Sequence, residues 1–372
     1  MKTLAIGVVG AGRLGGFHAQ KLAARPDVRL VGVADPIEDS RNRVAAQCGC
    51  RAFARTADLA ELVDAVVIAA PTRMHRELGV EFLSRRKHVL MEKPLATTAA
   101  EADDLVQLAR RNGLVLQVGH VERFNPAWVA AGPYLRQAKY IEGVRSGPFS
   151  FRSTDVGAVL DLMIHDIDLV LSLVRAPVKQ VEAIGLSVLG GHEDVANARI
   201  HFEGGAIAVL SACRVSYEPA RRMQVWTPRG FAAIDFATRT TSLIQPSERL
   251  LQRKLELDAL SPDELEHLRQ HLAEEHLPRQ QWTAEAVDAL ALELEDFVDS
   301  IRTPRVPRVS GLQGRDAVAL AEQILGQIGT HAWDDRADGP TGPLALPRTA
   351  VIPAPHFVRT PLGSPQPKRA AG

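Results

Sequence analysis

The sequence lacks most of the features that mark secreted, membrane-spanning or strongly charged proteins. It has three cysteines in 372 residues, too few for a disulfide framework and spaced unlike any metal motif. No apolar run approaches the roughly 18 residues that a membrane span requires, and no signal peptide is visible. The 44 basic residues balance 44 acidic ones, so net charge draws the protein toward neither nucleic acid nor an anionic membrane. We therefore expect a cytoplasmic protein without membrane or nucleic-acid partners.

The N-terminal third of the chain alternates short apolar runs with helical patterns. Nearly continuous apolar runs are typical of parallel strands that are buried on both faces. The expected strands are Leu4–Val9, Val28–Ala34, Ala65–Ala70, Val89–Met91 and Val115–Val118. The expected helices include Gly15–Ala24, Arg41–Gln47, His75–Arg85 and Thr98–Asn112. This alternation predicts a doubly wound parallel-sheet α/β domain over residues 1–122.

After Pro126 the pattern changes to longer strands joined by tight turns. The expected strands are Val178–Leu189, Val195–Phe202, Ile207–Ala212, Met223–Thr227 and Phe231–Asp235, with hairpin turns at Glu203–Gly205 and Thr227–Gly230. The expected helices are Asp161–Val174, Ala284–Ile301 and Gly314–Ile328. At about 150 residues per domain, the chain is long enough for a second domain. We expect a mostly antiparallel sheet domain over residues 123–330.

Two segments stand apart from these domains. Residues 247–280 are charged and leucine-spaced, and the sequence Ser261–Glu264 is a capping box, so this stretch is interpreted as an exposed helical insertion. Residues 331–372 form a proline-rich basic tail that we expect to be disordered or pinned along the surface. His267, His271 and His276 lie in the insertion near acidic residues and are interpreted as solvated helix surface, so no metal site is predicted.

The first predicted strand runs directly into a glycine-rich turn, Gly10-Ala11-Gly12-Arg13-Leu14-Gly15. The first glycine permits a tight turn, the second lets a pyrophosphate approach, and the third allows close helix–strand packing. Asp35 lies 20 residues after Gly15, where a carboxylate can accept hydrogen bonds from ribose hydroxyls. The motif predicts dinucleotide binding. Asp35 would repel a 2′-phosphate, so NAD is favoured, although Arg41 and Arg43 leave NADP open.

Further polar residues fall where catalysis is expected. Ala70-Pro71-Thr72 with His75, and Glu92-Lys93-Pro94, follow predicted strands, and ligands bind at the carboxyl ends of strands in open α/β sheets. Asp161 and His165 are four residues apart and would share one helix face. A carboxylate in that position can orient an imidazole that takes a proton from an alcohol. The same spacing also fits a polar pair on a solvated helix.

The glycine motif, Glu92-Lys93-Pro94 and Asp161-x-x-x-His165 together resemble the Gfo/Idh/MocA (glucose–fructose oxidoreductase / inositol dehydrogenase) family over roughly residues 3–330. The resemblance implies a Rossmann domain, an open-faced sheet domain that forms a homodimer or homotetramer, and a cis peptide between Lys93 and Pro94. It implies cofactor contacts from Gly10, Gly12, Arg13, Leu14, Asp35, Pro71, Thr72, His75, Glu92 and Lys93. It also implies that Lys93, Asp161 and His165 contact the substrate and carry out catalysis. In one version His165, held by Asp161, accepts the hydroxyl proton and Lys93 stabilises charge on that oxygen. In the other, Lys93 is the base.

The segment Gly119–Pro126 joins the two predicted domains. It is similar to the linker of family members that oxidise the 3-hydroxyl of UDP-N-acetylglucosamine and related nucleotide sugars. Arg123 could meet an anionic substrate or the cofactor, and Asn125 a sugar hydroxyl; alternatively, Arg123 only anchors the linker. This likeness implies an NAD-dependent dehydrogenase whose 3-keto product a PLP-dependent aminotransferase would convert to a 3-amino sugar for a lipid A variant. The alternatives are an inositol or free-sugar dehydrogenase and a non-catalytic NAD-binding sensor.

Overall fold

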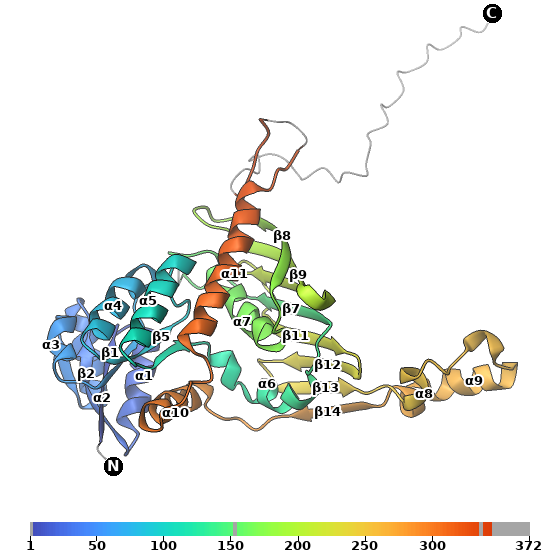
Figure 1. Ribbon diagram of the computed structural model, residues 1–372, viewed down its shortest axis with the longest axis horizontal. Helices are drawn as coiled ribbons and strands as arrows, with labels where there is room; N and C mark the ends of the chain where they lie inside the picture. Colours follow the sequence, from blue (N-terminus) through green and yellow to red (C-terminus); the bar gives the residue numbers. More distant parts are fainter. Residues whose placement is uncertain (1–2, 152–154, 335–337, 344–372) are drawn as a thin grey trace, which may run out of the picture.

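The computed structural model describes residues 3–151, 155–334 and 338–343, which form two sheets with associated helices (Figure 1). The strands of the first sheet are β1 (Leu4–Val9), β2 (Val28–Ala34), β3 (Arg51–Phe53), β4 (Ala65–Ile68), β5 (His88–Glu92) and β6 (Leu116–Gly119). Those of the second are β7 (Tyr140–Ser146), β8 (Val178–Leu186), β9 (Val195–Phe202), β10 (Ile207–Cys213), β11 (Ala220–Thr227), β12 (Gly230–Asp235), β13 (Thr240–Ile244) and β14 (Arg279–Thr283). The α-helices are α1 (Arg13–Ala23), α2 (Glu38–Cys48), α3 (Thr56–Ala60), α4 (His75–Ser84), α5 (Ala99–Arg111), α6 (Pro126–Ala131), α7 (Ile164–Leu173), α8 (Glu248–Leu251), α9 (Pro262–His271), α10 (Ala289–Arg302) and α11 (Gly311–Thr330).

The first sheet is entirely parallel, with strand order β3-β2-β1-β4-β5-β6. This is the order of dinucleotide-binding folds, and it confirms the α/β class that was predicted. Apolar clusters fill both faces, one under α4 and α5 and the other under α1 and α10. The predicted strands agree with the observed ones to within two residues. The carboxyl ends of the strands meet at one edge, where the candidate cofactor residues lie.

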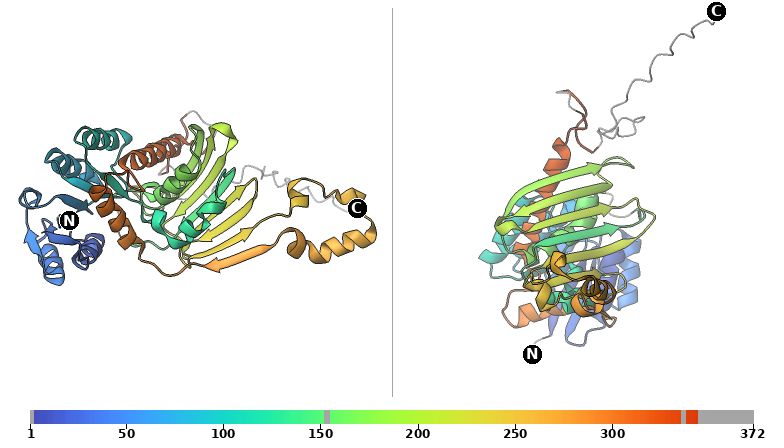
Figure 2. Two further views of the ribbon diagram at one scale, coloured as in Figure 1. Left: turned by 60° about the horizontal axis from the view of Figure 1, so that its bottom comes forward. Right: turned by 90° about the vertical axis from the view of Figure 1, so that its right-hand side faces the viewer.

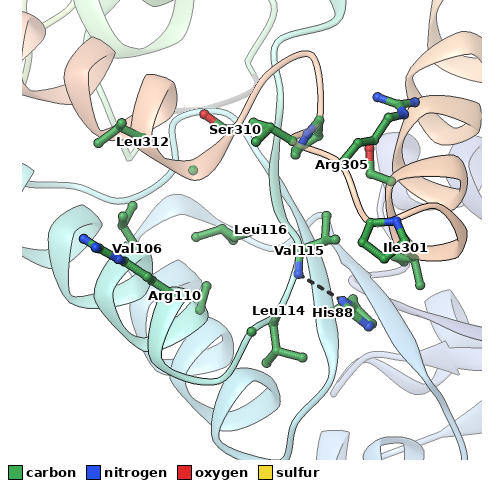
Figure 3. Close-up of a pocket in the computed structure, with 17 residues that line it drawn as sticks. His88, Val106, Arg110, Leu114, Val115, Leu116, Ile301, Arg305, Ser310 and Leu312 are labelled. Carbon is green, nitrogen blue, oxygen red and sulfur yellow. Dashed lines mark hydrogen bonds between the residues drawn. The ribbon is translucent and has the colours of Figure 1, made fainter.

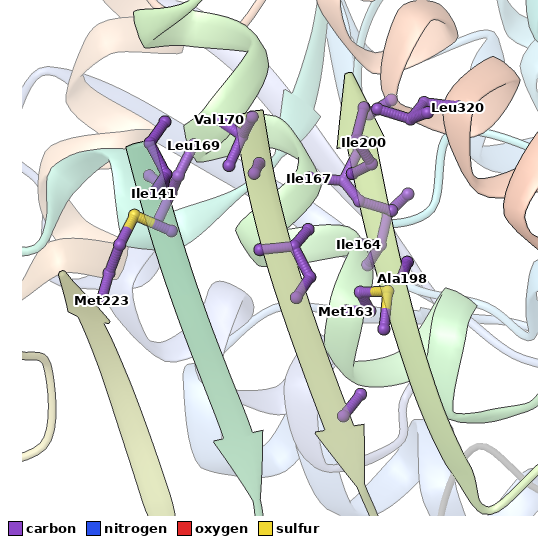
Figure 4. Packing of buried hydrophobic residues seen from close by; sticks show 14 of the residues in the cluster. Ile141, Met163, Ile164, Ile167, Leu169, Val170, Ala198, Ile200, Met223 and Leu320 are labelled. Atoms are coloured by element: carbon purple, nitrogen blue, oxygen red, sulfur yellow. The ribbon is translucent and has the colours of Figure 1, made fainter. Parts of the chain in front are cut away.

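The second sheet has the order β14-β13-β12-β11-β7-β10-β9-β8, in which only the pair β7 and β10 is parallel. Its inner face packs against α7 and α11, and the side chains of Ile141, Ile164, Ile167 and Ile200 interdigitate there (Figure 4). In the part of the chain that the structure describes, the helices that pack on this sheet lie on its inner face, and none packs on the opposite face (Figure 2). The mostly antiparallel, open-faced sheet was therefore predicted correctly.

Three strands of this sheet were not predicted. β7 carries a buried arginine, Arg145, and a glycine at its centre, so it lacks a simple apolar alternation. β13 and β14 flank the charged insertion, which projects away from the sheet as an arm with α8 and α9 (Figure 1). The predicted capping box is present, because Ser261 and Glu264 bond each other's backbone amides. His267 lies 3.1 Å from Glu275, with both side chains exposed, as expected for solvated surface.

The C-terminal helices connect the two sheets. α11 packs against α5 on one side and against α7 and β8 on the other. α10 begins at Ala289, later than predicted, because the Asp288 carboxylate accepts a hydrogen bond from the amide of Ala291. Part of the tail is hydrogen-bonded to the sheet domain, since Ser187 donates its amide to the carbonyl of Pro343; residues 344–372 lie outside the described part. Among the described residues, no helix is long and apolar enough to cross a membrane.

Candidate active site

The glycine-rich turn between β1 and α1 forms an open cradle. Gly10 has φ +97°, and a Cβ on Gly15 would lie 1.8 Å from the carbonyl oxygen of Gly10, so neither position admits a side chain. A Cβ on Gly12 would meet nothing within 4 Å. No side chain caps the first turn of α1, so its amides remain available to an anion. Free helix amides beside open space are what a dinucleotide pyrophosphate requires.

Asp35, at the end of β2, is fixed beside this cradle. Its Oδ2 accepts a hydrogen bond from the amide of Ala11 at 2.7 Å, and its Oδ1 accepts one from Ile37 at 2.8 Å. The two backbone donors fix the orientation of the carboxylate, whose remaining lone pairs can receive ribose hydroxyls. The nearby arginines point to carbonyl oxygens instead: Arg41 to that of Pro36 and Arg43 to that of Ala11. The donor set therefore fits NAD better than a cofactor with a 2′-phosphate.

The residues after β4 hold the loops of the nicotinamide end together. Thr72 and His75 are buried, whereas Pro71 is exposed. The two ring nitrogens of His75 lie 2.8 Å and 2.9 Å from the carbonyl oxygens of Pro94 and Ala70. His75 thus ties the end of β4 to the Lys93–Pro94 peptide, which is cis, as the resemblance implied. Arg13 and Leu14 lie in the exposed first turn of α1, beside the cradle.

Lys93 connects the two sheets through Asp161. Its Nζ donates to the backbone carbonyl of Asp161 at 2.7 Å and to the carboxylate Oδ1 at 3.0 Å. The Asp161 carboxylate pairs with Lys93, and the role of Asp161 in orienting His165 stays a prediction. Val159–Met163 form a π-helical turn rather than an α-helical one, which changes the facing of residues four apart. An ammonium is also a stronger partner for a carboxylate than a neutral imidazole.

His165 lies next to this pair in a desolvated environment. Burial and the neighbouring charges of Lys93 and Arg145 lower the pKa of His165 well below its usual range. Its Nδ1 is buried without a hydrogen-bond partner among the described residues. The ring of His120, which is buried, is in edge contact with the half-buried ring of His165 at a centroid distance of 6.1 Å. The arrangement gives a neutral imidazole beside a cationic ammonium, one able to take a proton and the other to stabilise an anion.

The linker residues are engaged in anchoring contacts. Asn125 donates to Glu122 and to the carbonyl of Phe236, and its Oδ1 caps α6. Arg123 lies 3.6 Å from the buried Asp168 and donates to the carbonyl of Arg308. The contacts of Arg123 agree with the alternative in which it anchors the linker, and its contact with a substrate or cofactor stays a prediction.

A buried ion network reinforces that anchoring. Arg145 on β7 donates to Glu122 of the linker at 2.8 Å and to Asp166 of α7 at 2.9 Å. All three side chains are under 10% exposed. Because α7 also carries His165, the network fixes the position of the candidate base relative to the Rossmann sheet.

A cavity of about 350 Å³ lies elsewhere on the first sheet (Figure 3). It is lined by the start of β5 and β6, by α5 and by the loop between α10 and α11; His88, Leu116, Arg110 and Arg305 are among its residues. These are the amino ends of the strands, whereas ligands in such sheets bind at the carboxyl ends. This cavity is therefore separate from the candidate active site.

Sequence reasoning missed three buried polar residues around the site: His18, His120 and Glu293. His18 is a buried residue of α1, and its Nε2 lies 2.6 Å from Oε1 of Glu92. Glu92 thus points into the domain, while accepting a hydrogen bond from the amide of Lys93 at 3.3 Å. A signal for Glu293 was available: it is a carboxylate flanked by the apolar core positions of α10.

The sheet order, the cradle and the Lys93–Asp161–His165 group define a dinucleotide-dependent oxidoreductase. Family models agree: residues 4–120 match the oxidoreductase family with NAD-binding Rossmann fold, and residues 136–233 match the GFO/IDH/MocA C-terminal domain. The chain belongs to the Gfo/Idh/MocA family of oxidoreductases.

Several relatives cover most of the chain. A UDP-N-acetylglucosamine 3-dehydrogenase of Acidithiobacillus ferrooxidans is 36% identical over 86% of this chain and 95% of its own. A solved structure of that dehydrogenase superposes with a TM-score of 0.76 at 34% identity, over 88% of this chain and 98% of the other. A myo-inositol 2-dehydrogenase of Thermotoga maritima is 26% identical over 85% of this chain and 93% of its own.

Proposed function

We propose that this protein oxidises the 3-hydroxyl of UDP-N-acetylglucosamine to the 3-keto nucleotide sugar with NAD. The observation that supports the proposal is the contact of Lys93, at the carboxyl end of β5, with Asp161 in the π-helical turn before α7, because ligands of such sheets bind at the carboxyl ends of the strands. The extent of similarity to the Acidithiobacillus enzyme, over almost the whole of both chains, supports this substrate.

The chain's own residues divide the work as follows. His165 accepts the hydroxyl proton, because its lowered pKa keeps a ring nitrogen unprotonated at neutral pH. Lys93, positioned by its hydrogen bonds to Asp161, donates to the same oxygen and stabilises its developing negative charge. The C3–H bond then breaks with its electron pair and the C–O bond becomes a carbonyl. The bound cofactor supplies the acceptor for that hydride.

Asp35 and the free amides of α1 bind the adenosine half of the cofactor, and Pro71, Thr72, Glu92 and Lys93 shape the nicotinamide end. Arg123 and Asn125 position the substrate indirectly, by anchoring the linker. The uncovered face of the second sheet presents half-exposed apolar side chains, including Val144 and Ile184. We infer that a second copy of the chain covers this face, since exposed apolar sheet surfaces favour association.

The test is an oxidation assay with purified protein. NAD and UDP-N-acetylglucosamine are mixed with protein and hydroxylamine, which traps the ketone because oxidation of an alcohol by NAD is unfavourable near neutral pH. Reduced cofactor is followed by near-ultraviolet absorbance. Free N-acetylglucosamine and myo-inositol are run in parallel, together with His165→Ala and, as a matched control, His192→Ala at an exposed position.

The proposal predicts cofactor reduction with the UDP sugar only, loss of the signal in His165→Ala and retention in His192→Ala. Equal activity with free N-acetylglucosamine or with inositol would refute the proposed substrate, although the protein would still be a dehydrogenase. Cofactor binding without turnover of any of these sugars would favour the sensor alternative.

A further inference from the structure

Three polar side chains from distant parts of the chain meet in the interior of the Rossmann domain. They are His18 of α1, Glu92 at the end of β5 and Glu293 of α10, and one nitrogen or oxygen atom of each lies within 4.8 Å of the others. Their exposed fractions are 0%, 7% and 0%. Glu92 is the residue before Lys93, and His18 lies on α1, the helix that begins at the glycine-rich turn; no step of the proposed reaction uses His18 or Glu293.

The hydrogen bonds in this cluster are distributed unevenly. Both carboxyl oxygens of Glu92 have a partner: Oε1 lies 2.6 Å from Nε2 of His18, and Oε2 accepts a hydrogen bond from the amide of Lys93. Both carboxyl oxygens of Glu293 are buried and have no hydrogen-bond partner among the described residues. A nearby donor, the side-chain amide of Gln117, bonds the backbone carbonyl of Glu293 rather than its carboxyl group.

Two ionised carboxylates this close in a dry site repel each other, and neither is hydrated. Glu293, whose two carboxyl oxygens have no hydrogen-bond partner among the described residues, is the group that burial and this repulsion disfavour as an anion. Burial, followed by the charge of Glu92 and that of Asp296, raises the pKa of Glu293 well above its usual range.

The other charged groups near α10 are paired elsewhere. Asp296, on the same helix, bonds Arg305 at 2.9 Å, and Lys21 of α1 bonds Asp288 at the start of α10. In the linker that packs against α10, Glu122 bonds Arg145, and Arg123 lies beside Asp168. Each of these cations thus has another carboxylate partner, and His18, the remaining titratable group of the cluster, bonds Glu92 through its Nε2.

A metal ion is the alternative way to neutralise two carboxylates, and the geometry disfavours it. Two ligands at ordinary zinc distances in a tetrahedral site lie about 3.3 Å apart. Nε2 of His18 and Oε1 of Glu92 are 2.6 Å apart, which is the distance of a direct hydrogen bond. A proton, rather than a dication, fits between these groups.

We propose that Glu293 is a positioning residue that works as a neutral acid. It fills the dry space beside Glu92 without adding a second negative charge, and its hydroxyl hydrogen is available to the Glu92 carboxylate. Glu92, as the single anion, then holds both His18 on the pyrophosphate-binding helix and the amide of Lys93. The positioning of Lys93 matters for catalysis only within the proposed function; the protonation of Glu293 does not depend on it.

The test uses Glu293→Gln, a neutral residue of the same shape, with Glu295→Gln on the exposed face of the same helix as control. Unfolding equilibria are measured from about pH 5 to 9. A carboxyl group with a raised pKa in the folded state takes up a proton on folding, so stability falls as pH rises through the window between the unfolded and folded pKa values. In that window the folded-to-unfolded ratio of the wild type should fall about tenfold per pH unit relative to Glu293→Gln. Glu295→Gln should run parallel to the wild type.

Affinity for reduced cofactor, measured over the same range, reports the positioning role. We expect the wild type to lose affinity as Glu293 ionises and Glu293→Gln to keep it. Parallel stability curves for wild type and Glu293→Gln would overturn the proposal, as would one equivalent of zinc in the purified protein. If the ratio of the cofactor affinities of the wild type and Glu293→Gln were the same at every pH, the positioning role would be overturned.

A measurement on the wild type protects the test against a variant that fails to fold. The infrared spectrum at neutral pH should contain the carbonyl band of a protonated carboxyl group, and its absence would contradict the proposal. None of these measurements involves a sugar. A protein that oxidises another substrate, or none, would therefore fail the proposed function and still pass this test.

Discussion

Replacing Asp35 with asparagine should weaken NAD binding and erase the discrimination against NADP. The Asp35 carboxylate is pinned by the amides of Ala11 and Ile37, so its charge faces the ribose end of the cradle. Hydrogen bonds to a charged acceptor contribute about 1 kcal/mol more than those to a neutral one. For two ribose hydroxyls the loss is about 2 kcal/mol, or roughly 30-fold in NAD affinity. The asparagine amide must also face one of the two backbone donors, which adds to the loss.

NADP should respond in the opposite sense, because the repulsion between Asp35 and a 2′-phosphate is removed while Arg41 and Arg43 remain nearby. Titration of cofactor fluorescence gives both dissociation constants, and Asp39→Asn, exposed on α2, is the matched control. NAD affinity within about twofold of wild type would refute the reasoning. So would an equal loss for the two cofactors, which would indicate only a disturbed cradle.

Three further results are expected. Lys93→Met should lower kcat by about 100-fold or more, as loss of an oxyanion donor does, while reduced cofactor still binds; retained turnover in rapid kinetics would exclude Lys93 from the chemistry. The pKa of His165 is lowered by burial, so the acid limb of the kcat/KM profile should lie below about pH 6.5, and a limb above that value would show that another group is the base. Arg145→Met should lower the free energy of unfolding by about 3 to 5 kcal/mol, because two buried carboxylates lose their partner. In the same denaturant titration, Arg222→Met, which breaks the exposed ion pair of Arg222 with Asp235, should lower the free energy of unfolding by at most about 1 kcal/mol. Equal losses of stability in the two variants would contradict the interpretation of Arg145 as the centre of a buried network.

The elements that position the cofactor could be predicted from sequence because their signals are local. The backbone of one tight turn requires glycine at Gly10 and Gly15, and binding of a ribose there requires a carboxylate such as Asp35. The apolar runs of β1 and β2 mark the neighbouring strands. The short strand β3 and the strand β7, which carries the buried Arg145, have no such local signal. Their pairing depends on partners far along the chain.

The contacts inside the site depend on tertiary structure and could not be read from spacing. Asp161 and His165 are four residues apart, but a π-helical turn and the arrival of Lys93 from the other sheet redirect the carboxylate. The cluster of His18, Glu92 and Glu293 joins residues from three distant parts of the chain. An ionisable residue on the apolar face of a helix can be noticed in a sequence, but its partner cannot be identified there.

The central claim is that this chain transfers the C3 hydrogen of UDP-N-acetylglucosamine to NAD. Its most direct test is to supply UDP-N-acetylglucosamine carrying deuterium at C3 and to weigh the reduced cofactor by mass spectrometry. The account predicts that the reduced cofactor gains the deuterium and that the trapped sugar loses it. Reduced cofactor without deuterium would mean that another carbon is oxidised, and absence of reduced cofactor would contradict the proposed substrate.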